Sequence, residues 1–125
     1  MTRFPRLHIH LYGPGGAPLG AAFDDVVCRV CALERLHYEP DGSLLLSGKT
    51  WQIGGLIYDR QEIVQYVELQ GTAPQERWRR LIRTIAGPSG AVSVLRLQDQ
   101  SLHDLQAFEN STWPAGDSDS RPSAG

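Results

Sequence analysis

The stretch Arg6-Leu-His-Ile-His-Leu-Tyr12 alternates apolar and polar side chains without a break. Successive side chains of a strand point to opposite faces, so this alternation predicts a strand with one face on a hydrophobic core. The core side is apolar and comprises Leu7, Ile9 and Leu11. The other side is polar and comprises His8, His10 and Tyr12. This strand decides the fold, because it fixes which side of a sheet the helices must cover.

Two further segments have the spacing of amphipathic helices. Apolar residues recur at helical intervals over residues 22–35, which predicts the first helix. A second helix is predicted from a cap at Thr72, with Gln75 as its capping-box partner, to a stop at Gly87 and Pro88. A last, short helix capped by Ser101 or Asp104 is expected to carry Leu102, Leu105 and Phe108.

Strands fill most of the sequence between these helices. Segments that are rich in β-branched and aromatic residues and bounded by turns predict strands over residues 44–47, 50–58, 62–70 and 91–97. Residues 36–39 fit neither a helix nor a strand clearly. The pair Gly54-Gly55 predicts a bulge or a close backbone approach in the middle of its strand.

The order β-α-β-β-β-α-β predicts an α+β domain in which two helices cover one face of a mainly antiparallel sheet. A ferredoxin-like sandwich with one extra strand is the nearest common architecture, with the first helix as a right-handed crossover between parallel strands. Residues 1–109 would form this single domain. Residues 110–125 are polar apart from Trp113, which predicts a disordered tail. Trp113 either docks on its own domain, anchors a partner, or is a terminal tryptophan without a role.

Composition and charge restrict the functions to be considered. The 125 residues are 41% hydrophobic and 21% charged, which are ordinary proportions for one globular domain. The net charge of −2 gives no electrostatic basis for general binding to nucleic acids or anionic membranes. With neither a transmembrane run nor a signal peptide, we expect a cytoplasmic protein. No hydrolase, kinase or nucleotide-binding motif is present, so we expect a non-enzymatic protein without a cofactor.

The motif Cys28-Arg-Val-Cys31 supports redox chemistry when it begins a helix. Here the helix is predicted to begin near Ala22, so Cys28 falls in the second turn, where the helix dipole has faded. The competing interpretation is packing, with Cys31 beside the apolar stripe and Cys28 toward the polar side. A thiol-redox or metal-binding protein that uses Cys28 and Cys31 stays an alternative.

His8 and His10 are two residues apart on one face of a strand, so both can reach one metal ion. Together with Cys28 and Cys31 they would supply the four ligands of a tetrahedral zinc site. The first helix must cover the apolar face, however, and this puts the cysteines and the histidines on opposite sides of the sheet. A site that joins the two histidines with His37 or a carboxylate stays open.

The second predicted helix is rich in arginine, and its polar side comprises Arg79, Arg80 and Arg83. These residues could bind an anion or a nucleic acid. The alternative is a solvated helix face on which Glu76 pairs with Arg80. We therefore treat anion binding by this helix as a third function hypothesis.

The leading hypothesis is a small binding or interaction domain that uses the outer face of its sheet. His8, His10 and Tyr12 are expected to share that face with two further tyrosines, Tyr58 and Tyr66. A sheet face lined with aromatic and imidazole rings is often covered by a ligand or a second subunit. The expected partner is an unidentified protein or a second copy of the chain.

Overall fold

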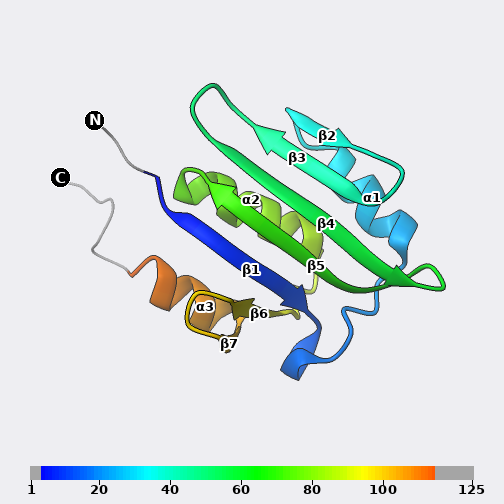
Figure 1. Cartoon of the computed structure of the whole chain (residues 1–125). Coiled ribbons are helices and arrows are strands. Elements are labelled where there is room, and N and C mark those ends of the chain that lie inside the picture. The colour runs from blue at the N-terminus through cyan, green and yellow to red at the C-terminus, as the bar shows by residue number, and fades with distance from the viewer. Residues whose placement is uncertain (1–3, 115–125) are drawn as a thin grey trace.

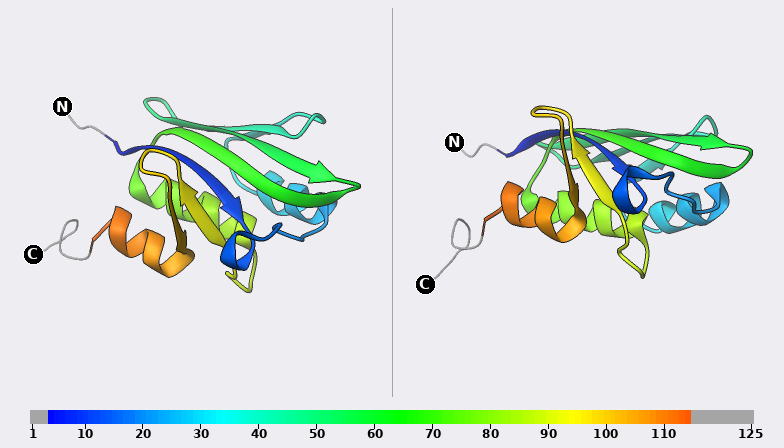
Figure 2. Two further views of the ribbon diagram at one scale, coloured as in Figure 1. Left: turned by 60° about the horizontal axis from the view of Figure 1, so that its bottom comes forward. Right: turned by 90° about the horizontal axis from the view of Figure 1, so that it is seen from below.

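A computed structural model describes residues 4–114 as one mixed α+β domain (Figure 1). Its helices are α1 (Phe23–Cys31), α2 (Gln75–Ala86) and α3 (Leu105–Thr112), with a short 3-10 turn, η1 (Pro14–Gly16). Its strands are β1 (Arg6–Tyr12), β2 (Leu36–Tyr38), β3 (Ser43–Ser47), β4 (Gln52–Arg60), β5 (Ile63–Thr72), β6 (Ser93–Arg96) and β7 (Ser101–Asp104). The three helices lie on one face of the sheet (Figure 2).

The sheet has seven strands in the order β2-β3-β4-β5-β1-β6-β7, and all neighbouring strands are antiparallel. An antiparallel sheet with helices on one face is therefore confirmed. The predicted parallel crossover is wrong, because the chain leaves β1, forms α1 and enters the sheet again at its far edge as β2. It returns to β1 only through the meander β2-β3-β4-β5 (Figure 1). The sheet is also larger than a ferredoxin-like sheet.

Several predicted boundaries differ in the structure. The α2 helix begins at Gln75 after Pro74 and has no side-chain cap, because Thr72 is still in β5, opposite Arg6 and Gln52. Residues 36–38 form the edge strand β2. Residues 101–104 form β7 instead of the start of a helix, because a segment of 4 residues alternates too briefly to predict a strand.

The last helix extends the domain beyond the predicted boundary at residue 109. Asp104 caps α3 by accepting a hydrogen bond of 2.7 Å from the backbone N–H of Ala107. The helix continues to Thr112, and Trp113 is only 7% exposed because it packs edge-on against Phe108. Trp113 therefore docks on its own domain. The disorder predicted for the rest of the tail, residues 115–125, lies outside the described residues.

The core lies between the three helices and the inner face of the sheet. Each helix contributes buried apolar side chains: Val26 and Val30 from α1; Trp78, Leu81, Ile82 and Ile85 from α2; Leu105 and Phe108 from α3. The predicted inner side of β1 is buried, as Leu7, Ile9 and Leu11. Arg29 of α1 donates to the carbonyl oxygens of Thr84 and Ile85, and so ties α1 to the end of α2.

The described helices are all too short or too polar to span a bilayer.

Candidate functional site

The outer face of the sheet lies away from the three helices (Figure 2). It carries the polar and aromatic side chains of three neighbouring strands, β4, β5 and β1. His10 of β1 stands opposite Glu68 of β5, and Tyr66 of β5 stands opposite Tyr58 of β4. The alternation of each strand puts the next residue but one on the same face. The resulting group, here called the outer cluster, comprises His8, His10, Tyr12, Tyr58, Tyr66 and Glu68. The structure thus brings together all five residues predicted for this face and adds Glu68.

Two imidazoles converge on the Glu68 carboxylate. His8 Nε2 lies 2.6 Å from Glu68 Oε2, and His10 Nε2 lies 3.8 Å from the same oxygen. One ligand atom from each of the three side chains can be chosen so that all lie within 4.8 Å of one another. All three side chains are partly buried, so solvent still reaches the group.

Tyrosines hold Glu68 and His10 in place. The Tyr58 hydroxyl donates to Glu68 Oε1 at 3.2 Å, which leaves Oε2 directed at the histidines. The Tyr12 hydroxyl lies 3.3 Å from His10 Nδ1. When Nδ1 carries the proton and donates to Tyr12, the Nε2 lone pair of His10 is free for a ligand. The Tyr66 ring lies against the rings of His10, Tyr12 and Tyr58, at centroid distances of 4.7, 5.2 and 4.4 Å.

The environment favours a charged carboxylate and a neutral imidazole. The hydrogen bond from His8 lowers the pKa of the Glu68 carboxyl, and the bond from Tyr58 acts in the same direction. Burial lowers the pKa of the His10 imidazole, against the opposing charge of Glu68. An ionised carboxylate and an unprotonated imidazole are the forms in which these groups bind metals.

Two imidazole nitrogens and one carboxylate oxygen form a recognised ligand set for zinc and for non-haem iron. Ligand atoms bound to a tetrahedral zinc ion at about 2.0–2.1 Å lie about 3.3 Å from one another. The distances of 2.6 and 3.8 Å to Glu68 Oε2 fall on either side of this value. Three protein ligands leave one coordination position for an external group.

The sequence allows a carboxylate partner for the two histidines but does not identify it as Glu68. The alternation Tyr66-x-Glu68 already puts the carboxylate on the face of Tyr66. What the local sequence does not contain is the register that sets Glu68 opposite His10, some 60 residues away. His37, the other suggested partner, lies in β2 at the edge of the sheet, and three strands separate it from β1.

The cysteines do not join the outer cluster. Cys28 and Cys31 are exposed free thiols on α1, which covers the opposite face of the sheet (Figure 2). The helix begins at Phe23, so Cys28 lies past its first turn, as predicted. Cys31 ends the helix and is exposed, so the prediction that it borders the core as a packing residue is wrong.

The arginines of α2 are partly engaged within the domain. Arg83 donates to Glu109 of α3 at 2.6 Å, and the Arg79 guanidinium lies 5.4 Å from the centre of the Trp113 ring. Arg80 is exposed. Two of the three arginines therefore connect the C-terminal segment to α2. The Arg83 side chain is still 57% exposed, and anion binding by this helix stays a prediction.

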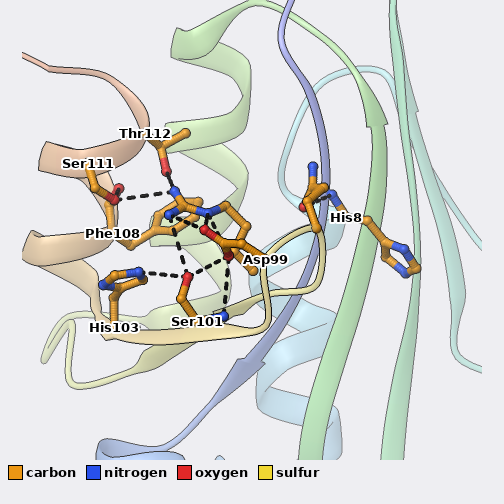
Figure 3. Close-up of polar contacts among 9 residues, drawn as sticks. His8, Asp99, Ser101, His103, Phe108, Ser111 and Thr112 are labelled. Atoms are coloured by element: carbon orange, nitrogen blue, oxygen red, sulfur yellow. Dashed lines mark hydrogen bonds and ion pairs between the residues drawn. The ribbon is translucent and has the colours of Figure 1, made fainter.

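A second polar cluster lies next to α3 and includes Asp99, Ser101, His103 and Thr112 (Figure 3). Its centre is Arg96. Arg96 donates to Asp99, at 3.0 Å, and to Thr112 at the end of α3, at 2.8 Å. The Ser101 hydroxyl donates to Asp99 at 2.6 Å and lies 2.9 Å from His103 Nε2. The hydrogen bonds from Arg96 and Ser101 lower the pKa of the Asp99 carboxyl to about 2.

This second cluster has a serine, a histidine and an aspartate, but not the arrangement of a hydrolase triad. In a triad the histidine accepts the serine proton and the aspartate holds the histidine. Here Ser101 donates its proton to Asp99, so the His103 nitrogen donates to Ser101. The cluster fastens the β6–β7 hairpin to α3, and His8 points away from it, toward the other side of β1 (Figure 3).

Comparisons with known proteins found no family, no curated protein and no solved structure that this chain matches.

Proposed function

We propose that this protein is a binding domain that holds one divalent transition-metal ion on the outer face of its sheet. His8 and His10 would each supply an imidazole nitrogen, and Glu68 would supply a carboxylate oxygen. The observation that carries this proposal is the convergence of three ligand atoms, from two strands, within 4.8 Å.

The hydrogen-bond pattern around the three ligands supports the same function. His8 Nε2 and Glu68 Oε2 face each other at 2.6 Å, and a cation bound by both atoms would displace the proton that they share. Tyr58 and Tyr12 bond to the atoms of Glu68 and His10 that would not face the ion. Outer hydrogen bonds of this kind orient metal ligands and are important for affinity.

The test is metal binding by the full chain after treatment with a chelating resin. We expect one equivalent of Zn²⁺ by isothermal titration calorimetry, and a visible absorption spectrum with Co²⁺ that reports its coordination geometry. Loss of a ligand commonly weakens a metal site by far more than loss of one of its outer hydrogen bonds, which costs about 10–100-fold. His10→Ala and Glu68→Gln should therefore weaken zinc binding by more than about 100-fold.

The matched controls are His37→Ala and Glu39→Gln, which remove the same chemical groups outside the outer cluster. They should leave the zinc affinity within about twofold. A wild-type chain that binds no zinc and no cobalt would refute the proposal. So would a chain whose binding survives both ligand substitutions, because the metal would then be held elsewhere.

Self-association through the outer face of the sheet is a second candidate function, and exposed leucines on that face favour it. Leu102 of β7 and Leu45 of β3 are 48% and 36% exposed. Their registers align them with His10 and His8, respectively, on the outer face. Light scattering of the metal-free chain tests this candidate. We expect a dimer that Leu102→Gln shifts toward monomer, and a chain that is monomeric at high concentration would exclude it.

A further inference from the structure

A groove runs along the outer face beside the outer cluster. Its wider part has a volume of about 610 Å³ and lies between the β3–β4 loop, at Gly48–Trp51, and the end of β5, at Gln70–Thr72. A second hollow of about 390 Å³ shares Gly54 and Gln70 with the first and reaches Glu68. The two hollows therefore adjoin at Gly54 and Gln70, and together they are here called the groove, which reaches a proposed metal ligand.

The floor of the groove is open because Gly54 has no side chain. Gly54 faces outward between Leu45 and Gln70, and a Cβ added there would meet nothing closer than the Gln70 carbonyl oxygen at 4.0 Å. Neither packing nor a left-handed backbone therefore requires a glycine at this position. A larger side chain would be accommodated by the fold and would fill the groove.

The wall formed by the β3–β4 loop is held by Trp51. The Arg77 guanidinium lies 5.1 Å from the centre of the Trp51 ring, and this contact connects the loop to α2. A Cβ at Gly48 would collide with the Trp51 indole, so glycine allows the loop to close onto the ring. The wall is thus packed against the rest of the domain.

The wider part of the groove is cationic. Arg6 and Lys49, the only lysine of the chain, both line it, and none of the carboxylates within residues 4–114 does. Within residues 4–114 neither cation makes an ion pair. Neutral side chains add hydrogen-bonding groups that have no side-chain partner in this part of the chain; they belong to Thr50, Gln52, Gln70 and Thr72. The other end of the groove is less polar and includes Leu56.

We propose that this groove binds a small organic anion. The anionic group lies between Arg6 and Lys49, where charge-assisted hydrogen bonds hold it. An apolar body extends over Gly54 toward Leu56, so that the ligand ends beside Glu68. This inference goes beyond the proposed function and does not rest on it, because none of the groups that hold the anion is a metal ligand.

Octanoate is a suitable probe, since it joins a carboxylate to an apolar chain, and octanol is its uncharged match. The experiment uses the full chain, labelled with ¹⁵N and freed of metal by chelating resin. We expect octanoate to shift the amide resonances of Gly48, Gly54 and Gly71 in a saturable manner. Octanol should bind at least about tenfold more weakly, because it cannot form the ionic contacts.

Two variants test the two parts of the groove. The double substitution Arg6→Gln with Lys49→Gln should weaken octanoate binding about tenfold or more. Its control, Arg60→Gln with Arg80→Gln, removes the same charge elsewhere and should leave the affinity within about twofold. Gly54→Leu should abolish octanoate binding by filling the floor, while it keeps the amide dispersion of a folded chain and the wild-type affinity for zinc.

Octanol binding as tight as octanoate binding would overturn the proposal, and so would unchanged octanoate binding by Gly54→Leu or by the double variant. The outcome is also independent of the metal site. A chain that binds octanoate but no zinc would refute the metal site alone, and a chain that binds zinc but no octanoate would refute the groove alone.

Discussion

The two faces of the sheet are built from the same strands, but the inner face is tightly packed and the outer face leaves open space. Adjacent glycines of β4 show the difference. A Cβ at Gly55, on the inner face, would lie 2.6 Å from Leu69 Cδ2 and 2.8 Å from the Glu68 carbonyl oxygen. A Cβ at Gly54, on the outer face, would be 4.0 Å from its nearest neighbour. Packing requires the first glycine, while the second leaves space at the surface. Removal of a side chain therefore serves the fold on one face and opens a groove on the other.

The largest difference in the free energy of unfolding between the two faces is expected in β1, where inward and outward residues alternate. Ile9 is fully buried, and Ile9→Ala should lower the free energy of unfolding by about 2–5 kcal/mol, because it leaves a cavity. His10→Ala, one residue away on the outer face, should cost less than about 1 kcal/mol. Urea denaturation of the metal-free chain measures both. Equal losses would mean that the outer cluster supports the fold as much as the core does.

The second prediction compares the stability of alanine variants at Gly54 and Gly55. Gly55→Ala should lower the free energy of unfolding by about 1–3 kcal/mol, because the added methyl group overpacks the site. Gly54→Ala has room and should be neutral or stabilise the fold by up to about 1 kcal/mol, because it restricts the unfolded chain. Thermal unfolding of the two variants is sufficient. A destabilised Gly54→Ala would show that this glycine has a packing role.

The smallest expected effect on stability is that of Asp99, which lies at the polar edge of the inner face, next to α3. The pKa of Asp99 is lowered from 3.8 to about 2, so its ionised form is more stable in the folded chain than in the unfolded chain. The resulting stability is present above pH 4 and is lost as the pH falls toward 2. Asp99→Asn should therefore be less stable than the wild type at pH 7, and the difference should disappear near pH 2. A difference that does not change with pH would point to packing and not to charge.

Local patterns predicted a large part of this fold. The alternation of β1 identified its buried side and its exposed side, and helical spacing located α1 and α2. The position of Asp104 as a cap was also recognisable. Short elements were not, since residues 36–38 and 101–104 have too few alternations to distinguish a strand from a loop or a helix.

The arrangement of the sheet and the place of Glu68 in the outer cluster could not be predicted in the same way. Both depend on which strands pair and in what register. The sequence of β1 contains no sign that it pairs with β5 on one side and β6 on the other. Glu68 becomes a partner of His8 and His10 only through that pairing. The arginines of α2 show the same limit, because their engagement with Glu109 and Trp113 requires the position of α3.

The central place of β1 also has a consequence for the order of folding. Tyr12 ends β1 and Ile63 begins β5, so about 50 residues must be synthesised before the first partner of β1 exists. Its second partner, β6, begins later still, at Ser93. Pairings so distant in sequence slow folding, and they leave the first strand without its sheet during synthesis. His8, His10 and Tyr12 make one side of β1 polar while it is still unpaired. An unpaired strand with a polar side is a poorer template for aggregation than an apolar strand of the same length.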